Sequence, residues 1–592
     1  MLKAVVANKK SDKRILTQWT ASNRQIWHNI PTSVKNKAIE EGVAAQKKSW
    51  PYLPLSLFRE HTAVGNRERY QGPYFEKRRM LGSLVLAECI EGRGRFLADI
   101  EEGIWSIIGE VVWVIPAHNS YIRDTPALPT PQTGRPIIDL FAAETAALLA
   151  LTIHLLEDRL DSGLLKTVTH QLQVRLVTPY LEDHFWWMGS EGEKLNNWTP
   201  WCTQNVLLCA LTMGLSDDER DRVITQAAKS LDYWLDGYGE DGCCDEGPHY
   251  WHAAALCLYG SLFLLEEALG ETVTALYEVK KIRNMASYIC SVHIEDDLYL
   301  NFADSSPKAG RLGAREWRFG VAVNDEKLKR RALLDYRHDP FAKGDNDYNL
   351  LYRLFALLDA NELMHADLPV ASQKQPFIWY PSVELAIYRR SGFTLAVKGG
   401  NNDDSHNHND VGSLILYDKA KPLLIDVGVE TYTKTTFSDQ RYTLALMQSH
   451  YHNVVNFPPY GQEAGAEYAA EILSLSDSFI DLELSKAYDG AAKVTSYRRS
   501  VTIEDGRVVV HERIDARHSP VLSLMSVDQP KDEDSALRFD GWSIVFDRSC
   551  TVTIEAMVIE DARLRQAWPA MLWRTTVAFE NELVWSVLRT NQ

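Results

Sequence analysis

Cysteine is scarce in this chain of 592 residues, and its eight copies form no C-x-x-C pair. That spacing marks many structural zinc sites and redox centres, and paired cysteines hold together small secreted domains. Neither pattern is present. We therefore expect free, partly buried thiols of a reducing compartment.

Two kinds of apolar run are missing as well. Residues 1–13 contain no apolar stretch followed by a cleavage site of small residues, so the sequence as printed shows no secretory signal. It also has no run of about 18 uncharged apolar residues, which argues against a membrane span. The expected location is cytoplasmic, or periplasmic or secreted if a leader was removed.

Positive charge is the third deficit. The chain has 63 Lys and Arg residues against 80 Asp and Glu residues, a formal net charge of −17. Nucleic acids bind to basic surfaces, so we expect no nucleic-acid partner. An acidic ligand would need a local basic pocket, for which Arg79 is a candidate together with Arg67, Arg69 and Arg78, although a solvated basic face explains the same residues.

The length and the changing pattern of the sequence predict more than one domain, because single cores stop growing at about 250 to 300 residues. Up to about residue 370 the chain has Ala- and Leu-rich runs, such as 138–150 and 251–259. These runs are apolar on most faces, which is typical of helices that pack on several sides. A layered array of helix pairs, as in a toroid or solenoid, is the expected arrangement.

After Pro376 the sequence changes to short alternating segments rich in β-branched residues, which indicate antiparallel strands. The clearest segments are 383–388, 393–397, 479–484, 499–503, 508–513 and 551–554. The fold class we expect is therefore α+β multidomain, with a helical domain over 1–370 and an antiparallel β-sandwich over 371–592.

The densest polar segment is 404–410, which contains His406 and His408. In an extended backbone these two side chains would share one face. One of them, Asp426 and one of His450 or His452 could supply nitrogen and oxygen ligands of the kind that suit Zn²⁺.

Two alternatives for these histidines stay open. They could simply hydrogen-bond turns at a strand edge. Alternatively, His408, Asp410 and His452 could form the two-histidine, one-carboxylate site of an iron oxygenase, which would require a compact barrel.

Asn196, Asn197 and Trp198 stand at an expected helix start in the helical half. An amide can donate a hydrogen bond to a substrate carboxylate, and an indole ring can stack on a sugar. Helix capping by Asn is the alternative explanation.

Two further segments carry polar side chains next to aromatic ones. A Gly- and Pro-punctuated loop presents Glu246, His249 and Tyr250 just before a helix, and His118 closes a Trp-Pro-His run over 113–118. A buried, hydrogen-bonded tyrosine would explain the first segment, and core packing with a helix cap would explain the second.

In this order, several segments resemble the heparinase II/III-like superfamily of polysaccharide lyases, which includes heparinases and alginate lyases. The segments are 113–118, 196–198, 246–251, 301–305, 406–412, 424–428 and 452–453. The resemblance runs from about residue 60 to residue 455. It implies an incomplete (α/α) toroid followed by an antiparallel β-sandwich.

The resemblance also implies β-elimination at a uronic acid to give a 4,5-unsaturated sugar. The proton removed from C5 lies next to a carboxylate and is barely acidic. An enzyme must therefore stabilise an enolate-like dianion and protonate the leaving oxygen.

Carried over residue by residue, the resemblance makes Tyr250 the general acid and, for one C5 configuration, also the base. His406 becomes the other base. Asn196 or Asn197 would neutralise the substrate carboxylate, with Asn196 preferred. The expected substrate-binding residues are Trp198, His118, Glu246, His249 and Arg79.

For the histidine-rich segment, the resemblance implies one structural Zn²⁺ held by His408, Asp426 and His452. The two neighbouring histidines would then have different tasks, with His408 on the metal and His406 facing the substrate.

The expected substrate is a uronic-acid-containing glycan, with a glycosaminoglycan such as heparan sulfate placed first and alginate or another acidic oligosaccharide as the alternative. A glycoside hydrolase, which would use two carboxylates such as Glu246 and Asp304, is a rival function. A non-catalytic glycan-binding protein is another. The oligomeric state stays open, a homodimer included.

Overall fold

The computed structural model describes residues 1–7, 9–11, 14–123, 125–341, 348–371, 373–533 and 535–590. The chain divides into two compact units. Unit 1 comprises Met1–Tyr238, His252–Ser287 and Arg311–Ala371, and unit 2 comprises Gly239–Trp251, Tyr288–Gly310 and Ser372–Gln592. Two short segments from the helical half of the sequence thus belong to the β-rich unit, and both carry residues of the site described below.

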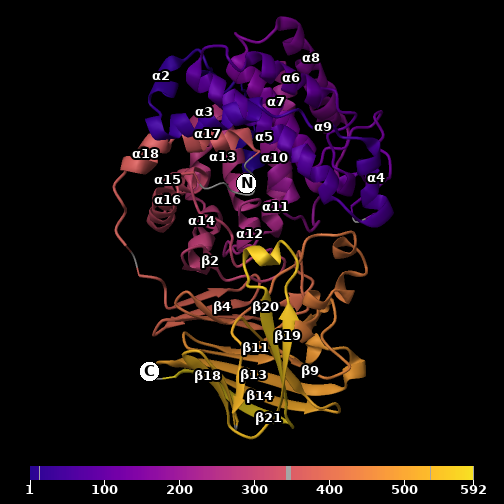
Figure 1. Ribbon diagram of the computed structural model, residues 1–592, viewed down its shortest axis with the longest axis vertical. Coiled ribbons are helices and arrows are strands. Elements are labelled where there is room, and N and C mark those ends of the chain that lie inside the picture. The colour runs from indigo at the N-terminus through magenta and orange to yellow at the C-terminus, as the bar shows by residue number, and fades with distance from the viewer. Residues whose placement is uncertain are drawn as a thin grey trace. The chain divides into compact units, whose positions relative to one another are not determined.

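Unit 1 is built from α-helices, as its Ala- and Leu-rich runs predict (Figure 1). They are α1 (Leu2–Val6), α2 (Arg24–His28), α3 (Thr32–Gln46), α4 (Leu55–Val64), α5 (Glu68–Glu91), α6 (Leu97–Ile108), α7 (Leu140–Leu156), α8 (Ser162–Leu172), α9 (Thr178–Glu182), α10 (Trp198–Thr212), α11 (Asp217–Gly237), α13 (Ala255–Leu269), α15 (Ala314–Ala322), α16 (Glu326–His338), α17 (Leu350–Leu358) and α18 (Ala360–His365). Helix α14 (Lys280–Val292) runs from unit 1 into unit 2.

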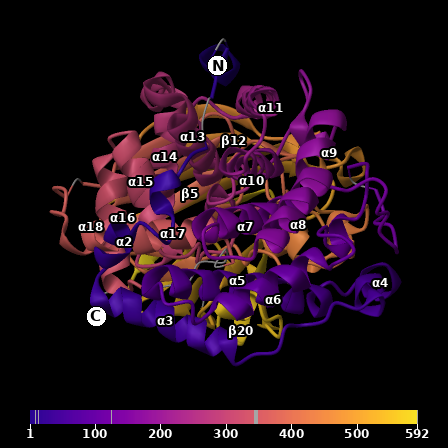
Figure 2. The same cartoon turned by 90° about the horizontal axis from the view of Figure 1, so that it is seen from above.

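The core of unit 1 is formed by helices that are apolar on most faces. Helix α10 packs against both α7 and α13 (Figure 2). Almost every residue of α7 is buried, because alanines on one side allow close approach while leucines fill the space on the others. Asp139 begins this helix by accepting a hydrogen bond at Oδ1 from the backbone N–H of Ala142, at 2.7 Å.

The segment Pro248–Thr272 is long and apolar enough to cross a membrane by composition alone, with a mean hydropathy of 1.4 over its most apolar window. However, 78% of that window is buried inside the fold. A helix in a protein core is both apolar and buried, and α13 occupies most of this segment.

Unit 2 is an antiparallel β-structure that also contains the short helix α12 (Pro248–Trp251). Its five-stranded sheet has the order β3 (Phe377–Tyr380), β4 (Leu385–Arg390), β5 (Phe393–Lys398), β7 (Leu414–Asp418) and β8 (Lys421–Leu424). The eight-stranded sheet has the order β11 (Glu471–Leu475), β12 (Phe479–Glu483), β13 (Val494–Glu504), β14 (Arg507–Ala516), β21 (Glu582–Arg589), β18 (Trp542–Phe546), β17 (Ala536–Phe539) and β16 (Lys531–Glu533). A four-stranded sheet contains β19 (Thr551–Val558), β20 (Met571–Ala578), β15 (Val521–Ser526) and β9 (Val455–Asn456). Two small sheets pair β10 (Gly465–Ala469) with β6 (Asn401–Asn402), and β1 (His293–Glu295) with β2 (Leu298–Tyr299).

The five- and eight-stranded sheets share one apolar core. Leu395 and Leu416, paired across β5 and β7, belong to the same buried cluster as Val510 and Trp585, paired across β14 and β21. Two sheets joined by interleaved apolar side chains form a sandwich. The predicted order of a helical domain and then an antiparallel β-sandwich is confirmed.

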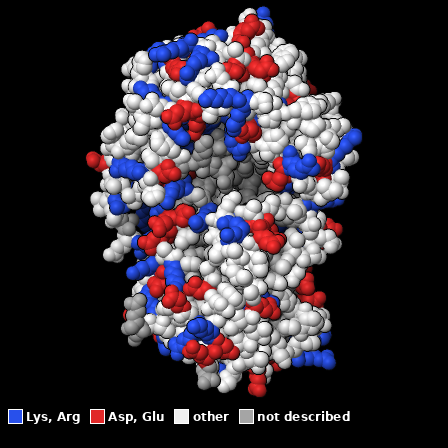
Figure 3. Space-filling model, in the orientation of Figure 1, with Lys and Arg blue, Asp and Glu red and all other residues white. Residues whose placement is uncertain are grey.

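All eight cysteines lie in the described part of the chain, none of them is joined in a disulfide there, and six are buried. On the face drawn in Figure 3, Lys and Arg side chains are interspersed with Asp and Glu side chains. Mixed charge of this kind gives no continuous basic surface on that face.

Candidate functional site

Unit 2 brings Tyr250 and His406 into direct contact. Their rings stack with centroids 4.5 Å apart and planes inclined by 26°. Tyr250 lies in α12, and His406 lies in the loop between β6 and β7. Two side chains of the kinds that serve in general acid–base catalysis are thus held together by segments more than 150 positions apart in the sequence.

The predicted extended backbone at His406 and His408 is wrong. His406 has a φ of 58°, in the left-handed region, and the segment around it forms turns rather than a strand. An imidazole is tolerated there more readily than a β-branched side chain. The two rings meet through a third residue instead of through a shared strand face.

That third residue is Asp304, which is fully buried. Its Oδ2 accepts hydrogen bonds from His406 Nδ1 at 2.7 Å and from the Tyr432 hydroxyl at 3.1 Å. Its Oδ1 accepts hydrogen bonds from His408 Nε2 at 3.0 Å and from Arg441 Nη2 at 2.6 Å. Burial opposes ionisation of this carboxyl, but the histidine and arginine partners outweigh burial and hold its pKa well below the ordinary value.

The charge states of Tyr250 and His406 follow from their neighbours. Burial raises the pKa of Tyr250 to about 12, although the guanidinium of Arg563 opposes the rise. Burial would lower the pKa of His406, but its hydrogen bond to Asp304 and the charge of Glu246 outweigh burial and raise it. The phenol is therefore protonated at neutral pH, and an imidazolium beside it is well stabilised.

Glu246 and His249 flank this pair. Glu246 is buried, and its Oε2 lies 3.3 Å from His406 Nε2. His249 contacts the Tyr250 ring edge-on at 5.7 Å between centroids, and its backbone N–H donates to Ser305 Oγ at 3.1 Å. Both lie beside the Tyr250–His406 pair. Because Glu246 and Asp304 are buried around one imidazole, they do not present two carboxylates to a sugar as a hydrolase requires.

Tyr432, Arg441 and Arg563 also belong to this site, although no sequence pattern indicated them. The hydroxyl of Tyr432 is hydrogen-bonded to the hydroxyl of Tyr250. The guanidinium of Arg563 lies over the Tyr432 ring, 4.4 Å from its centroid, and donates to the backbone oxygen of Asp304 at 3.0 Å. Arg441 also donates to the backbone oxygens of Asn407 and His406, both at 3.0 Å.

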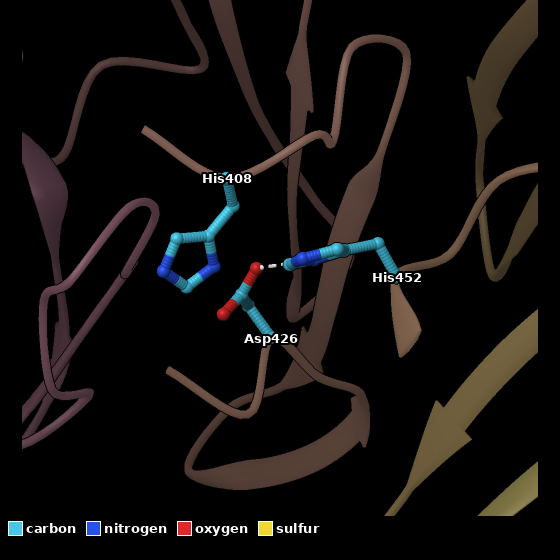
Figure 4. Close-up of side chains that lie close together, drawn as sticks. All are labelled: His408, Asp426 and His452. Carbon is cyan, nitrogen blue, oxygen red and sulfur yellow. Dashed lines mark hydrogen bonds and ion pairs between the residues drawn. The ribbon is translucent and has the colours of Figure 1, made fainter. Parts of the chain in front are cut away.

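Three side chains beside this pair point toward one another, as Figure 4 shows for His408, Asp426 and His452. All three are buried, and one ligand atom of each lies within 4.8 Å of the others. Asp426 stands between Ile425 and Val427, whose side chains belong to a small apolar cluster. Its carboxylate faces the two imidazoles (Figure 4).

The hydrogen bonds of the two rings turn the same nitrogen toward Asp426. His408 Nε2 donates to Asp304, and its Nδ1 has no hydrogen-bond partner among the described residues. His452 Nε2 donates to the backbone oxygen of Leu446 at 3.1 Å, and its Nδ1 lies 3.0 Å from Asp426 Oδ2. Two neutral imidazoles held in this way present two nitrogen lone pairs to a carboxylate, a donor set that fits a cation.

The other metal-ligand sets do not fit as well. Asp410, which the iron site would use, accepts a hydrogen bond from the buried ammonium of Lys398 at 2.6 Å. The group of three ligands found among the described residues contains neither Asp410 nor His450. The structure therefore favours His408, Asp426 and His452.

The remaining predicted residues lie in unit 1. Asn196 accepts a hydrogen bond at Oδ1 from the backbone N–H of Trp198, at 3.1 Å, which leaves the amide NH₂ as its donor group. Asn197 is only 3% exposed. Asn196 is half-buried, so its side chain is more accessible than that of Asn197 to a ligand bound by unit 1.

An aromatic group surrounds Trp198. Its ring lies 4.6 Å from that of His118 and 4.9 Å from that of Trp186, and the guanidinium of Arg123 lies over Trp186 at 4.8 Å. His118 Nδ1 is 2.8 Å from Asp139 Oδ2. Aromatic faces beside a guanidinium suit an acidic sugar.

The guanidinium of Arg79 lies 5.9 Å from the centroid of the Tyr348 ring. Of the other arginines considered from the sequence, Arg78 is buried and paired with Glu110 at 2.6 Å. Arg69 is paired with Glu60 at 2.8 Å. Two arginines of the predicted basic group are therefore paired with carboxylates of the protein itself.

One family model matches part of the β-rich half. Residues 372–559 match the family model described as "Heparinase II/III-like, C-terminal". None of the curated proteins matches the chain by sequence.

Solved structures match over nearly the whole chain. A crystal structure of heparinase III is 13% identical, with a TM-score of 0.61, covering 100% of this chain and 89% of that one. The heparan sulfate lyase HepC from Pedobacter heparinus is 12% identical, with a TM-score of 0.54, covering 95% and 88% of the two chains. The chondroitin AC lyase of Streptomyces coelicolor A3, in complex with chondroitin sulphate, is 10% identical, with a TM-score of 0.51, covering 95% and 83%. At these identities the likeness establishes the fold.

Proposed function

We propose that this chain, whose residues 372–559 belong to the Heparinase II/III-like C-terminal family, is a polysaccharide lyase that cleaves a uronic-acid-containing glycan by β-elimination. The observation that carries the proposal is the stacked pair of Tyr250 and His406. A lyase needs a proton acceptor and a proton donor close together, and a hydrolase needs two carboxylates that reach the sugar.

The reaction moves two protons. The proton on C5 passes to the base, a double bond forms between C4 and C5, the bond from C4 to the leaving oxygen breaks, and that oxygen receives a proton. Tyr250 is the proposed acid, because its pKa of about 12 keeps the phenol protonated. For one C5 configuration it is also the proposed base.

His406 is the proposed base for the other configuration. Its Nδ1 is held by Asp304, so Nε2 is the nitrogen that accepts the proton. The neighbouring carboxylates of Asp304 and Glu246 stabilise the imidazolium that results. Asn196 is proposed to donate its amide hydrogen to the substrate carboxylate, with Trp198, His118 and Arg79 as further substrate contacts.

One Zn²⁺ is proposed to be held by His408, Asp426 and His452. The orphan Nδ1 of His408 and the buried Asp426 carboxylate fit an ion that takes nitrogen and oxygen ligands. When bound, Zn²⁺ would supply a fixed positive charge that stabilises the loops carrying its ligands.

Glycosaminoglycans such as heparan sulfate are the substrate class we place first, with alginate as the alternative. The test is incubation with heparan sulfate, chondroitin sulfate, hyaluronan and alginate while the ultraviolet absorbance of unsaturated uronate is followed. Absorbance that rises with the wild type and not with Tyr250→Phe supports the proposal. New reducing ends without absorbance would show a hydrolase, and binding without either product would show a non-catalytic glycan-binding protein.

A further inference from the structure

The loop 301–305 is buried between the segments that carry the proposed catalytic and metal-binding residues of unit 2. Asn301, Asp304 and Ser305 are all fully buried. The Asn301 amide donates to the backbone oxygen of Asp426 at 3.2 Å and to that of Ser305 at 3.3 Å. Ser305 Oγ in turn accepts from the backbone N–H of His249. The loop thus contacts both the Tyr250 segment and the Asp426 segment.

Two glycines allow this close packing. Both Gly247 and Gly428 have positive φ angles, of 87° and 81°. A Cβ atom on Gly247 would lie 2.6 Å from Ser305 Cβ, and one on Gly428 would lie 3.1 Å from the Ser305 backbone oxygen. The backbones of Gly247 and Gly428 therefore pack directly against Ser305. The segments that carry these glycines hold the loop, and with it Asp304, from two sides.

The two oxygens of Asp304 serve two different histidines. Oδ2 binds Nδ1 of His406, and Oδ1 binds Nε2 of His408. Each bond fixes the tautomer and the tilt of one ring, so His406 turns Nε2 toward Glu246 and His408 turns Nδ1 toward Asp426. Carboxylates that hold metal-bound histidines in this way raise metal affinity and orient the ring.

We propose that Asp304 is a positioning residue that couples the two halves of the site, holding His406 for proton transfer and His408 for metal binding through a single carboxylate. This inference rests on the proposed function and on the proposed zinc site. Asp304 is fully buried and so does not touch a glycan itself.

An amide at this position cannot replace the carboxylate. Asp304 accepts four hydrogen bonds, two at each oxygen, from His406 and Tyr432 on one side and from His408 and Arg441 on the other. Asn has one acceptor oxygen and an NH₂ group that only donates. In Asp304→Asn the NH₂ group must therefore face two donors, and one of the two histidines loses its bond.

The experiment compares Asp304→Asn with the wild type and with Asp481→Asn. Asp481 is a matched control, because it is also fully buried and accepts from Arg498 at 2.9 Å and from Ser500 at 2.8 Å. Zn²⁺ affinity is measured by competition with a chelator, and kcat and KM are measured with saturating Zn²⁺. We expect Asp304→Asn to bind Zn²⁺ about 10- to 100-fold more weakly and to lose at least about 10-fold in kcat with KM nearly unchanged. Asp481→Asn should match the wild type in all three values.

Two results would overturn the inference. Asp304→Asn could behave like Asp481→Asn, or it could regain full kcat once saturated with Zn²⁺, which would limit Asp304 to the metal. Absence of lyase activity in the wild type would instead overturn the proposed function.

A measurement on the wild type does not depend on lyase activity. The ¹⁵N resonances of His406, assigned by their absence from His406→Gln, should shift when Zn²⁺ is removed, because His408 shares Asp304 with His406. A His406 signal that does not respond to removal of Zn²⁺ would contradict the coupling.

Discussion

The phenol ring of Tyr250 lies against the imidazole ring of His406, with 4.5 Å between the ring centroids. Both residues belong to unit 2, so the proposed acid and base are positioned within one compact unit. The contact consists of ring faces, while the hydroxyl of Tyr250 is hydrogen-bonded to Tyr432. Removal of that hydroxyl can therefore be separated from loss of the stack.

Tyr250→Phe should retain the stacked ring and lose the acid. General acid–base catalysis contributes about 10²- to 10⁴-fold to rate, so we expect kcat to fall by that factor with little change in melting temperature. Initial rates of unsaturated-uronate formation measure the effect, and thermal unfolding provides the control for folding. A variant with more than a tenth of wild-type activity would show that Tyr250 is not the acid.

Zinc content should separate the two neighbouring histidines. His408→Ala removes a proposed ligand and should abolish Zn²⁺ binding, whereas His406→Ala should retain one ion per chain. Bound Zn²⁺ stabilises the folded state by about 2.7 kcal/mol when its free concentration is 100 times its dissociation constant. A chelator should therefore lower the melting temperature of the wild type and of His406→Ala, and leave that of His408→Ala unchanged.

Metal analysis and calorimetry on the same samples check this prediction. Loss of Zn²⁺ from His406→Ala would show that the two histidines do not have separate tasks.

The sandwich could be predicted because its signal is local. Alternation of apolar and polar residues identifies a strand without knowledge of its partner, and the predicted segments 393–397 and 508–513 lie in β5 and β14. The apolar strand signals beside the candidate ligands indicated a metal site but left the choice of histidines open, and the resemblance to the lyase superfamily selected His408, Asp426 and His452. The structure brings these three side chains together.

The residues that were missed have no local signal. Tyr432, Arg441 and Arg563 stand in irregular or short helical segments, and each acquires its role only through contact with Asp304 or Tyr250. The left-handed backbone at His406 was also missed, because alternation at 404–410 looks the same in a strand and in a turn. Such contacts depend on tertiary structure, which spacing along the chain does not encode.

Arg563 should tune the acidity of Tyr250. Burial raises the pKa of Tyr250 to about 12, and the positive charge of Arg563 limits that rise. Arg563→Gln should raise the pKa further, weaken the acid and lower kcat, while Arg563→Lys keeps the charge and should retain more activity. The comparison of kcat in the two variants is the measurement, and equal losses would exclude an effect of charge.

Glu144 should make the stability of unit 1 depend on pH. Burial raises the pKa of this carboxyl from 4.5 to about 7, although Asn349 donates a hydrogen bond to Oε1 at 2.8 Å. Because the pKa is raised in the folded state, the protonated form is favoured there. The contribution to stability is complete below pH 4.5 and is lost as the pH rises through about 7. A shift of this size corresponds to about 3 kcal/mol.

Glu144→Gln removes the ionisable group and keeps both an acceptor and a donor in the same volume. We expect the variant to be more stable than the wild type at pH values above the folded pKa, and the advantage to disappear near the unfolded pKa. Thermal unfolding of both proteins, in one buffer below the unfolded pKa and one above the folded pKa, measures the difference in stability between them. An advantage that is the same at both ends would mean that Glu144 has the same pKa in the folded and the unfolded protein, because only a difference between these two pKa values makes the stability difference depend on pH.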